Sequence, residues 1–221
     1  PDWLPVESEI GAALDALATT LTKAGARVAE AQPTSLGDFR HHYAVFCEMA
    51  HALMSMGVPP EEKAARARMF RARGDEFYLA CARGVEASAG EFLLLHRERE
   101  QCRASFRAFF REWDVLLAPI TLTAALPHGP MPFPPLVTNL DRTLDVNARR
   151  VDYNLQLVLP SVAGLGGQPA TAFPVGFTRA GLPLGLQAIG PYLEDRTTIR
   201  FAARVAERIG GFRRPPGYEA D

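Results

Sequence analysis

The sequence predicts an α/β protein in which helices flank a mixed β-sheet. Apolar residues recur at helical spacing through the first half, and residues 114–120 form a short apolar run that includes a proline. Two β-prone segments near the carboxyl end are joined by a turn signal. The 221 residues are 48% hydrophobic, so we expect one unit with a real core, mainly helical over 1–113. Residues 114–221 should hold the strands, a pocket loop, a hairpin and a final helix.

The first segments predict two helices with a strand between them. Ile10, Leu14 and Leu17 lie on one apolar stripe, and this helix should stop at Gly25. The apolar alternation around Val28 predicts a short strand. A second helix is indicated by apolar residues three or four positions apart, at Leu36, Phe39, Tyr43, Phe46, Ala50 and Leu53.

The middle of the chain predicts a charged helix, a long helix and a strand. Residues 61–73 are entered through Pro60, and their arginines stand near glutamates, which indicates a solvated face. Ser88 and Glu91 have capping-box spacing, so a long helix is expected over 89–111. Residues 114–120 predict a buried strand, and the proline-rich stretch 121–139 is long enough to cover or line a pocket.

The last third predicts a β-hairpin and a helix. Strands are expected at 170–177 and 184–189, after a tight turn at the glycine-rich residues 164–167. Pro174 has no amide hydrogen to donate, so its strand should lie at an edge or carry a bulge. Asp195 is expected to cap a helix whose inner stripe consists of Ile199, Ala202, Val205, Ala206 and Ile209.

Composition argues against several classes of partner. The 24 basic and 25 acidic residues give a net charge of -1, without the basic excess that nucleic acids or anionic membranes require. No charged-then-apolar leader is seen, and the odd number of cysteines favours reduced, buried thiols. We therefore expect a cytoplasmic protein with no nucleic-acid or membrane partner.

The residues alone indicate no self-sufficient active site. No serine stands in a G-x-S-x-G or S-x-x-K pattern, and the glycine-rich stretch lacks the residues that complete a nucleotide-binding loop. The histidines lack metal-ligand spacing. We expect neither a metal nor a cofactor, and we assign no catalytic residue.

Several ordered blocks resemble the amidase signature family. They are DVLLAP at 114–119, SVAGLGGQPATAFPVG at 161–176, GLPLGLQAIGP at 181–191 and EDRTT at 194–198. The resemblance spans essentially the whole chain and is strongest from 88 to 210. It implies the C-terminal portion of the amidase signature fold, and hydrolysis of a small-molecule carboxamide to the acid and ammonia or an amine through a Ser acyl-enzyme.

The chain also departs from this family. The family's catalysis rests on a nucleophilic Ser, a second Ser on a cis peptide and a Lys, all upstream of the region resembled here. No Gly/Ser-rich signature segment occurs in this sequence, and neither Lys23 nor Lys63 stands in a matching context. The resemblance therefore implies that an N-terminal portion of the same amidase supplies the catalytic residues, and that this chain alone is inactive.

Two other interpretations stay open. One is the A subunit of a glutamine-dependent tRNA amidotransferase, from another branch of the same family, although residues 194–198 and 210–217 look more like stand-alone amidases. The other is a non-catalytic binding or scaffold module, which would cover its open apolar interface by forming a homo-oligomer.

A wall of the substrate pocket is predicted from the loop after the strand at 114–120. Segments that leave the carboxyl ends of parallel strands tend to border the ligand crevice, and the corresponding stretch of amidases lies near the acyl-binding side. Thr121, Thr123 and His128 are therefore expected to face the substrate as wall residues. In the alternative interpretation the threonines satisfy turn backbone groups and His128 is a surface residue.

Overall fold

The structure, a computed structural model, describes residues 1–127, 140–214 and 218. The chain divides into two compact units. Unit 1 comprises residues 1–31, 113–160 and 168–221, and unit 2 comprises residues 32–112 and 161–167. The predicted α/β fold class is confirmed, because helices are combined with small antiparallel sheets.

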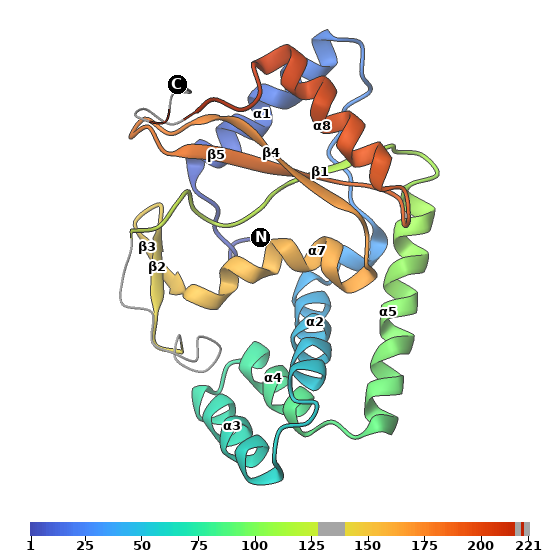
Figure 1. Cartoon of the computed structure of the whole chain (residues 1–221), viewed down its shortest axis with the longest axis vertical. Coiled ribbons are helices and arrows are strands. Elements are labelled where there is room, and N and C mark those ends of the chain that lie inside the picture. Colours follow the sequence, from blue (N-terminus) through green and yellow to red (C-terminus); the bar gives the residue numbers. More distant parts are fainter. Residues whose placement is uncertain (128–139, 215–217, 219–221) are drawn as a thin grey trace. The chain divides into compact units, whose positions relative to one another are not determined.

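A three-stranded sheet lies at the centre of unit 1 (Figure 1). Its order is β1 (Leu116–Pro119), β5 (Pro183–Ile189) and β4 (Ala170–Phe177), and both strand pairs are antiparallel. The predicted strand at 114–120 is therefore confirmed over a shorter range. The antiparallel pairing of β1 removes one premise of the pocket prediction, which assumed a strand parallel to its neighbours.

The predicted hairpin between β4 and β5 is confirmed. Thr178 N–H donates to the Leu182 carbonyl at 2.8 Å, and Gly181 takes a positive φ of 82° in the turn. Both expectations for Pro174 hold, since β4 is an edge strand and its register shifts between Pro174 and Gly176. The missing amide hydrogen of proline is tolerated where the ladder is already interrupted.

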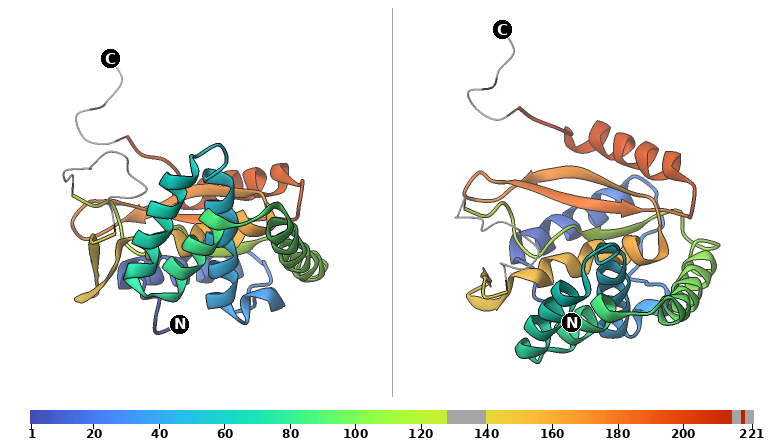
Figure 2. Two further views of the ribbon diagram at one scale, coloured as in Figure 1. Left: turned by 90° about the horizontal axis from the view of Figure 1, so that it is seen from below. Right: turned by 60° about the horizontal axis from the view of Figure 1, so that its bottom comes forward.

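Two helices, α1 (Ser8–Lys23) and α8 (Asp195–Ile209), pack on this sheet (Figures 1 and 2). Alternate residues of β5 point to one face, because side chains in a strand have a period of two. These residues join α1 and α8 in one buried cluster that contains Ile10, Leu17, Phe173, Leu184, Leu186, Ala188 and Val205. The sheet therefore buries one face against both helices.

Three expectations for unit 1 are wrong in detail. Val28 lies outside any strand and is 39% exposed, because no neighbouring strand is placed to pair with it among the described residues. Ile199 is 58% exposed and does not belong to the inner stripe of α8. Asp195 is the first helical residue, and Glu194 occupies the cap position without a side-chain cap bond.

The elements between residues 143 and 166 were not predicted. A hairpin of β2 (Thr143–Val146) and β3 (Arg149–Asp152) turns at two residues with positive φ. The short 3₁₀ helix η2 (Tyr153–Leu157) then leads into α7 (Val158–Gly166), which begins in unit 1 and ends in unit 2. The tight turn expected at 164–167 is thus mostly the end of a helix, with Gly167 at a φ of 70° as its stop.

Unit 2 is helical. It contains η1 (Thr34–Leu36), α2 (Phe39–Met54), α3 (Pro60–Arg73), α4 (Glu76–Glu86) and α5 (Ala89–Phe109). The helices expected after residues 36, 60 and 88 are confirmed, with the start of the first of them moved from Leu36 to Phe39. Helix α4 was not predicted.

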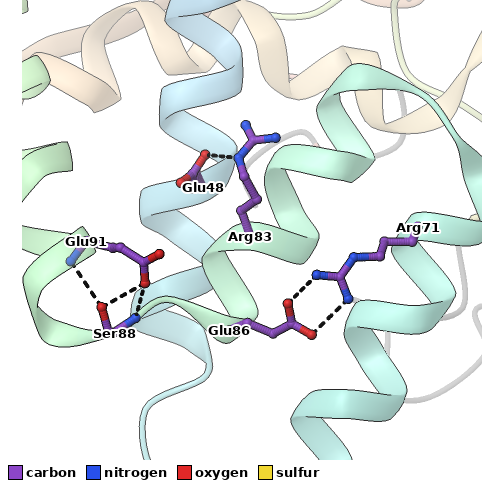
Figure 3. A network of polar contacts seen from close by, with 6 residues as sticks. All are labelled: Glu48, Arg71, Arg83, Glu86, Ser88 and Glu91. Carbon is purple, nitrogen blue, oxygen red and sulfur yellow. Dashed lines mark hydrogen bonds and ion pairs between the residues drawn. The ribbon is translucent and has the colours of Figure 1, made fainter.

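Helices α2 and α4 run parallel and very close. Their contacts pair Arg40 with Glu76, Tyr43 with Phe77 and Glu48 with Arg83, at an almost constant sequence offset. Gly84 permits this approach, because a Cβ there would overlap the Glu48 backbone carbonyl. Figure 3 shows the Glu48–Arg83 pair beside the bidentate Arg71–Glu86 pair between α3 and α4, and the capping box at the start of α5.

The three cysteines are free and buried, as expected. Cys47 on α2 and Cys81 on α4 belong to the core of unit 2. A hydrogen bond with Cys47, together with burial, raises the pKa of the Cys81 thiol far above its ordinary value. Cys81 is therefore uncharged, and both cysteines serve as small core residues.

Within the described residues, none of the helices is both long enough and apolar enough to cross a bilayer.

Candidate functional site

The predicted wall residues Thr121 and Thr123 line a cavity of about 330 Å³ in unit 1. We call it the threonine pocket. Its walls come from the loop after β1, the start of β5, α1 and η2, at Ile10, Ile120, Thr121, Thr123, Ala124, Ala125, Leu126, Gln156, Pro183, Leu184 and Gly185. His128, the third predicted wall residue, lies outside the described residues.

The loop that carries the threonines is held by the residue before α1. Glu7 N–H donates to the Leu122 carbonyl at 2.8 Å, and the Glu7 carboxylate accepts a hydrogen bond from Ala124 N–H at 2.9 Å. Leu122 between the threonines is fully buried. These contacts hold the loop in one conformation, although its described residues do not pair with a neighbouring strand.

A buried glutamine fixes the strand that enters the loop. The Gln187 side-chain amide donates to the Pro119 carbonyl at 2.9 Å and to the Leu159 carbonyl at 3.2 Å. Gln187 is 5% exposed, so these carbonyls depend on its two N–H groups rather than on water. The glutamine therefore ties β5 to the end of β1 and to the first residues of α7.

The two threonines have different roles in the pocket. Thr123 is buried, and its hydroxyl donates to the Ala124 carbonyl at 3.0 Å, which is the local backbone role foreseen as the alternative. The Thr121 hydroxyl is buried and has no hydrogen-bond partner among the described residues. Thr121 is thus the residue of this wall with unused hydrogen-bonding capacity. Leaving a buried hydroxyl unpaired costs folding free energy, which a hydrogen bond to a bound group would recover.

The side chains that line the threonine pocket are uncharged. Its lining is mostly apolar, and the polar side chains in it are two threonines and one glutamine, all neutral. Activation of a hydroxyl nucleophile requires an adjacent base, and none of the lining residues is a base. The described lining therefore offers an apolar surface and one unpaired hydroxyl, and it does not place a base beside a hydroxyl nucleophile.

Several serines of the chain occupy structural positions. Ser88 caps α5, and Ser105 accepts a hydrogen bond from Ser35 N–H at 2.8 Å. Ser55 and Ser161 are fully buried in unit 2. Lys23 ends α1, whereas Lys63 lies in α3.

Among residues 1–127, 140–214 and 218, no group of three or more His, Cys, Asp or Glu side chains is placed to hold a metal ion.

Sequence reasoning missed three residues that shape the site. Gln156 lies in the unpredicted η2, and Glu7 acts through a loop more than a hundred positions away. Gly185 stands in the GLPLGLQ block, and a Cβ there would lie 3.2 Å from the Ile120 side chain that lines the pocket. Only Gly185 carried a sequence signal, because it belongs to a quoted block of the family resemblance.

Comparisons with known proteins match this chain to amidases and related amidotransferases. The family model described as Amidase matches residues 2–199. A glutamyl-tRNA(Gln) amidotransferase subunit from Zymomonas mobilis is 34% identical over 127 residues, which are 56% of this chain and 23% of that protein. A fatty acid amide hydrolase from Medicago truncatula is 29% identical over 129 residues, 58% of this chain and 20% of that protein.

A solved structure shares the fold. The chain superposes on a crystal structure of an amidase with a TM-score of 0.64 at 22% identity, covering 93% of this chain and 43% of the other. The chain thus spans about a quarter of the length of the curated relatives and less than half of this solved neighbour.

Proposed function

The chain belongs to the amidase family, and from this premise we propose that it is the C-terminal portion of an amidase that cleaves a carboxamide to the acid and ammonia or an amine. The observation that carries the proposal is the family match over residues 2–199, combined with the absence of a Gly/Ser-rich signature segment from the sequence. The nucleophilic Ser, the second Ser and the Lys would then belong to an N-terminal portion. In this interpretation the protein acts through a Ser acyl-enzyme.

The contribution of this chain would be to wall the substrate pocket. The threonine pocket supports that role, because it is apolar, lacks a base and holds one unpaired hydroxyl. Thr121, Thr123 and His128 are the wall residues we propose. The substrate class that fits is a neutral amide with an apolar group, since a charged group would lose its hydration against this lining without gaining a partner.

Amide hydrolysis by the complete protein tests the proposed function. Ammonia or amine release should be measured on a panel of aliphatic and aryl amides together with glutamine. We expect turnover of neutral apolar amides, and no turnover by residues 1–221 alone. Lack of activity on every amide, or full activity of the isolated chain, would contradict the proposal.

Substitutions of the wall residues test the role of the pocket. Thr121→Val keeps the side-chain shape and removes the unpaired hydroxyl, so it should raise KM or change the ranking of amides without lowering stability. Thr123→Ala and His128→Ala should also change KM and substrate ranking. Thr19→Ala, on the exposed side of α1, is the matched control and should change neither. If selectivity stays the same and only stability shifts, the loop is structural.

A second candidate function is that of the amidotransferase branch, which serves a tRNA-dependent reaction. The observation that favours it is the 34% identity with the glutamyl-tRNA(Gln) amidotransferase subunit from Zymomonas mobilis. Such a protein would release ammonia from glutamine for a partner protein. Stable co-purification with a partner complex, and glutamine as the preferred amide, would place this function above the stand-alone amidase.

A further inference from the structure

A second cavity, in unit 2, contains a thiol beside an imidazole. It has a volume of about 320 Å³ and lies among η1, α2, α5 and the end of α7. Cys102 and His42 line it, and the Cys102 Sγ lies 3.9 Å from the His42 Nδ1. We call it the thiol pocket.

The tautomer of His42 follows from its second hydrogen bond. The His42 Nε2 lies 3.0 Å from the Ser161 carbonyl oxygen, which can only accept. Nε2 therefore carries the proton of the neutral ring, and Nδ1 presents a lone pair to the Cys102 thiol. Burial lowers the pKa of His42 below its ordinary value, so the ring is neutral and able to act as a base at pH 7.

The other side of the thiol faces hydroxyl groups. The Ser35 hydroxyl donates to the Cys102 Sγ at 3.9 Å, and Ser35 is held by its own N–H bond to the Ser105 hydroxyl. Thr34 is within 3.1 Å of the same Ser105 oxygen. The thiol thus has a base on one side and a hydrogen-bond donor on the other, and the base is oriented by a backbone carbonyl. This is the arrangement that activates a nucleophile.

We propose that Cys102 is a nucleophilic modification site that adds to small α,β-unsaturated carbonyl compounds entering the thiol pocket, with His42 as its base. The Sγ–H bond breaks as the Cys102 sulfur bonds to the β-carbon, and the proton moves to His42 Nδ1. The π-electron pair of the C=C bond moves to the α-carbon, which then takes the proton back from His42. The net reaction adds S–H across C=C and needs no oxidant or reductant, and it is independent of the proposed amide hydrolysis.

Burial explains why the pair rests uncharged. Burial raises the pKa of the Cys102 thiol, against the lowering effects of the Ser35 hydroxyl, Arg103 and Arg99. Two other ionisable side chains line the pocket, His41 on α2 and Glu98 on α5. Neither η1 nor α7 carries an ionisable side chain. The reactive form holds one proton shared between Cys102 and His42. Its population is constant between the two pKa values of the pair.

The probe is N-ethylmaleimide, with modified residues identified by peptide mass mapping of the native protein. We expect Cys102, which lines the thiol pocket, to react, and Cys47 and Cys81, which are buried away from it, to react only after denaturation. The rate at Cys102 should be constant between pH 7 and 8. In His42→Gln the rate at pH 7 should fall by about tenfold or more, and it should then rise with pH in proportion to the thiolate.

Ser35→Ala tests the pair without altering the imidazole. It should slow the reaction by about threefold, because the sulfur loses a donor that stabilises its anion, while the rate stays constant with pH. Thermal melting of both variants checks that they are folded. The proposal is overturned if Cys102 reacts no faster than Cys47 and Cys81, or if the wild-type rate rises with pH as steeply as that of His42→Gln.

Discussion

Ser88 illustrates how one side chain specifies where a helix begins. Its hydroxyl accepts from Glu91 N–H at 3.2 Å, and the Glu91 carboxylate accepts from Ser88 N–H at 2.8 Å. We expect Ser88→Ala to lower the free energy of unfolding by about 1 kcal/mol, because amide groups at the start of α5 lose their partner. Ser88→Asn, which can still cap, should restore most of the loss. Urea denaturation followed by circular dichroism measures both, and equal losses would contradict the capping role.

The same capping box should make the free energy of unfolding depend on pH. Hydrogen bonds from Ser88 lower the pKa of Glu91 below its ordinary value of 4.5. A carboxyl whose pKa is lower in the folded state stabilises the protein above the unfolded pKa, and this contribution is lost as pH falls through the folded pKa. Wild type should therefore be more stable than Glu91→Gln at pH 7, and the difference should shrink steadily below about pH 4.5. A difference that stays constant down to pH 3 would contradict this assignment.

Gly84 sets the spacing of α2 and α4. Because an added Cβ would overlap the Glu48 carbonyl, Gly84→Ala should lower the free energy of unfolding by about 1–3 kcal/mol through overpacking. Gly11→Ala is the matched control, since its Cβ would meet no atom within 4 Å in α1 and should raise stability by about 0.5–1 kcal/mol. The two variants should move the urea midpoint in opposite directions. A neutral Gly84→Ala would show that the helices can separate at no cost.

At the scale of elements, the sequence predicted correctly those features that depend on neighbouring residues, such as helix caps and tight turns. The capping box at Ser88 and the turn at Gly181 were predicted correctly because each forms among residues close in sequence. The strand expected at Val28 failed because a strand needs a partner, and periodicity does not show whether one is present. Helix α4 was missed although Asp75 caps it by accepting from Phe77 N–H at 2.8 Å, a signal that was present in the sequence.

The sequence of the β2–β3 hairpin contains no typical turn signal. Its turn residues Asn147 and Ala148 have φ values of 50° and 62°, and alanine is an unusual choice where glycine is preferred. Tertiary contacts compensate: the Asn147 side chain donates to the Val6 carbonyl at 2.8 Å and accepts from Ser8 N–H at 3.0 Å. Contacts between residues 139 and 141 positions apart cannot be inferred from a local sequence pattern.

Substitution of Gln187 tests how much its hydrogen bonds stabilise the connection between β1, β5 and the start of α7. Gln187→Leu keeps the approximate size but removes two donors, so the Pro119 and Leu159 carbonyls lose a partner inside the core. We expect a loss of about 1–3 kcal/mol in the free energy of unfolding. Gln101→Leu, the same change at an exposed position of α5, should stay within about 0.5 kcal/mol. A similar effect of both changes would show that the buried amide bonds contribute little.

At the scale of the whole molecule, the family was readable from the sequence whereas the site was only partly so. Ordered blocks such as DVLLAP and GLPLGLQ were specific enough to indicate the family that the match over residues 2–199 then showed. Thr121 and Thr123 line a cavity, and their role as walls of a substrate pocket stays a prediction. That prediction rested partly on a parallel-strand premise that the antiparallel β1–β5 pair does not meet. The unpaired state of Thr121 depends on packing and could not be inferred from residue types.

The division of labour that we propose is a property of the complete protein. This chain would supply pocket walls, and an N-terminal portion would supply the nucleophile. Serine-directed covalent labelling tests this most directly, with phenylmethanesulfonyl fluoride as the reagent and intact mass followed by peptide mapping as the measurement. We expect one label on the complete protein, at a serine outside residues 1–221, and none on residues 1–221 alone. Labelling of a serine within this chain, accompanied by amide turnover by the chain alone, would contradict the central claim.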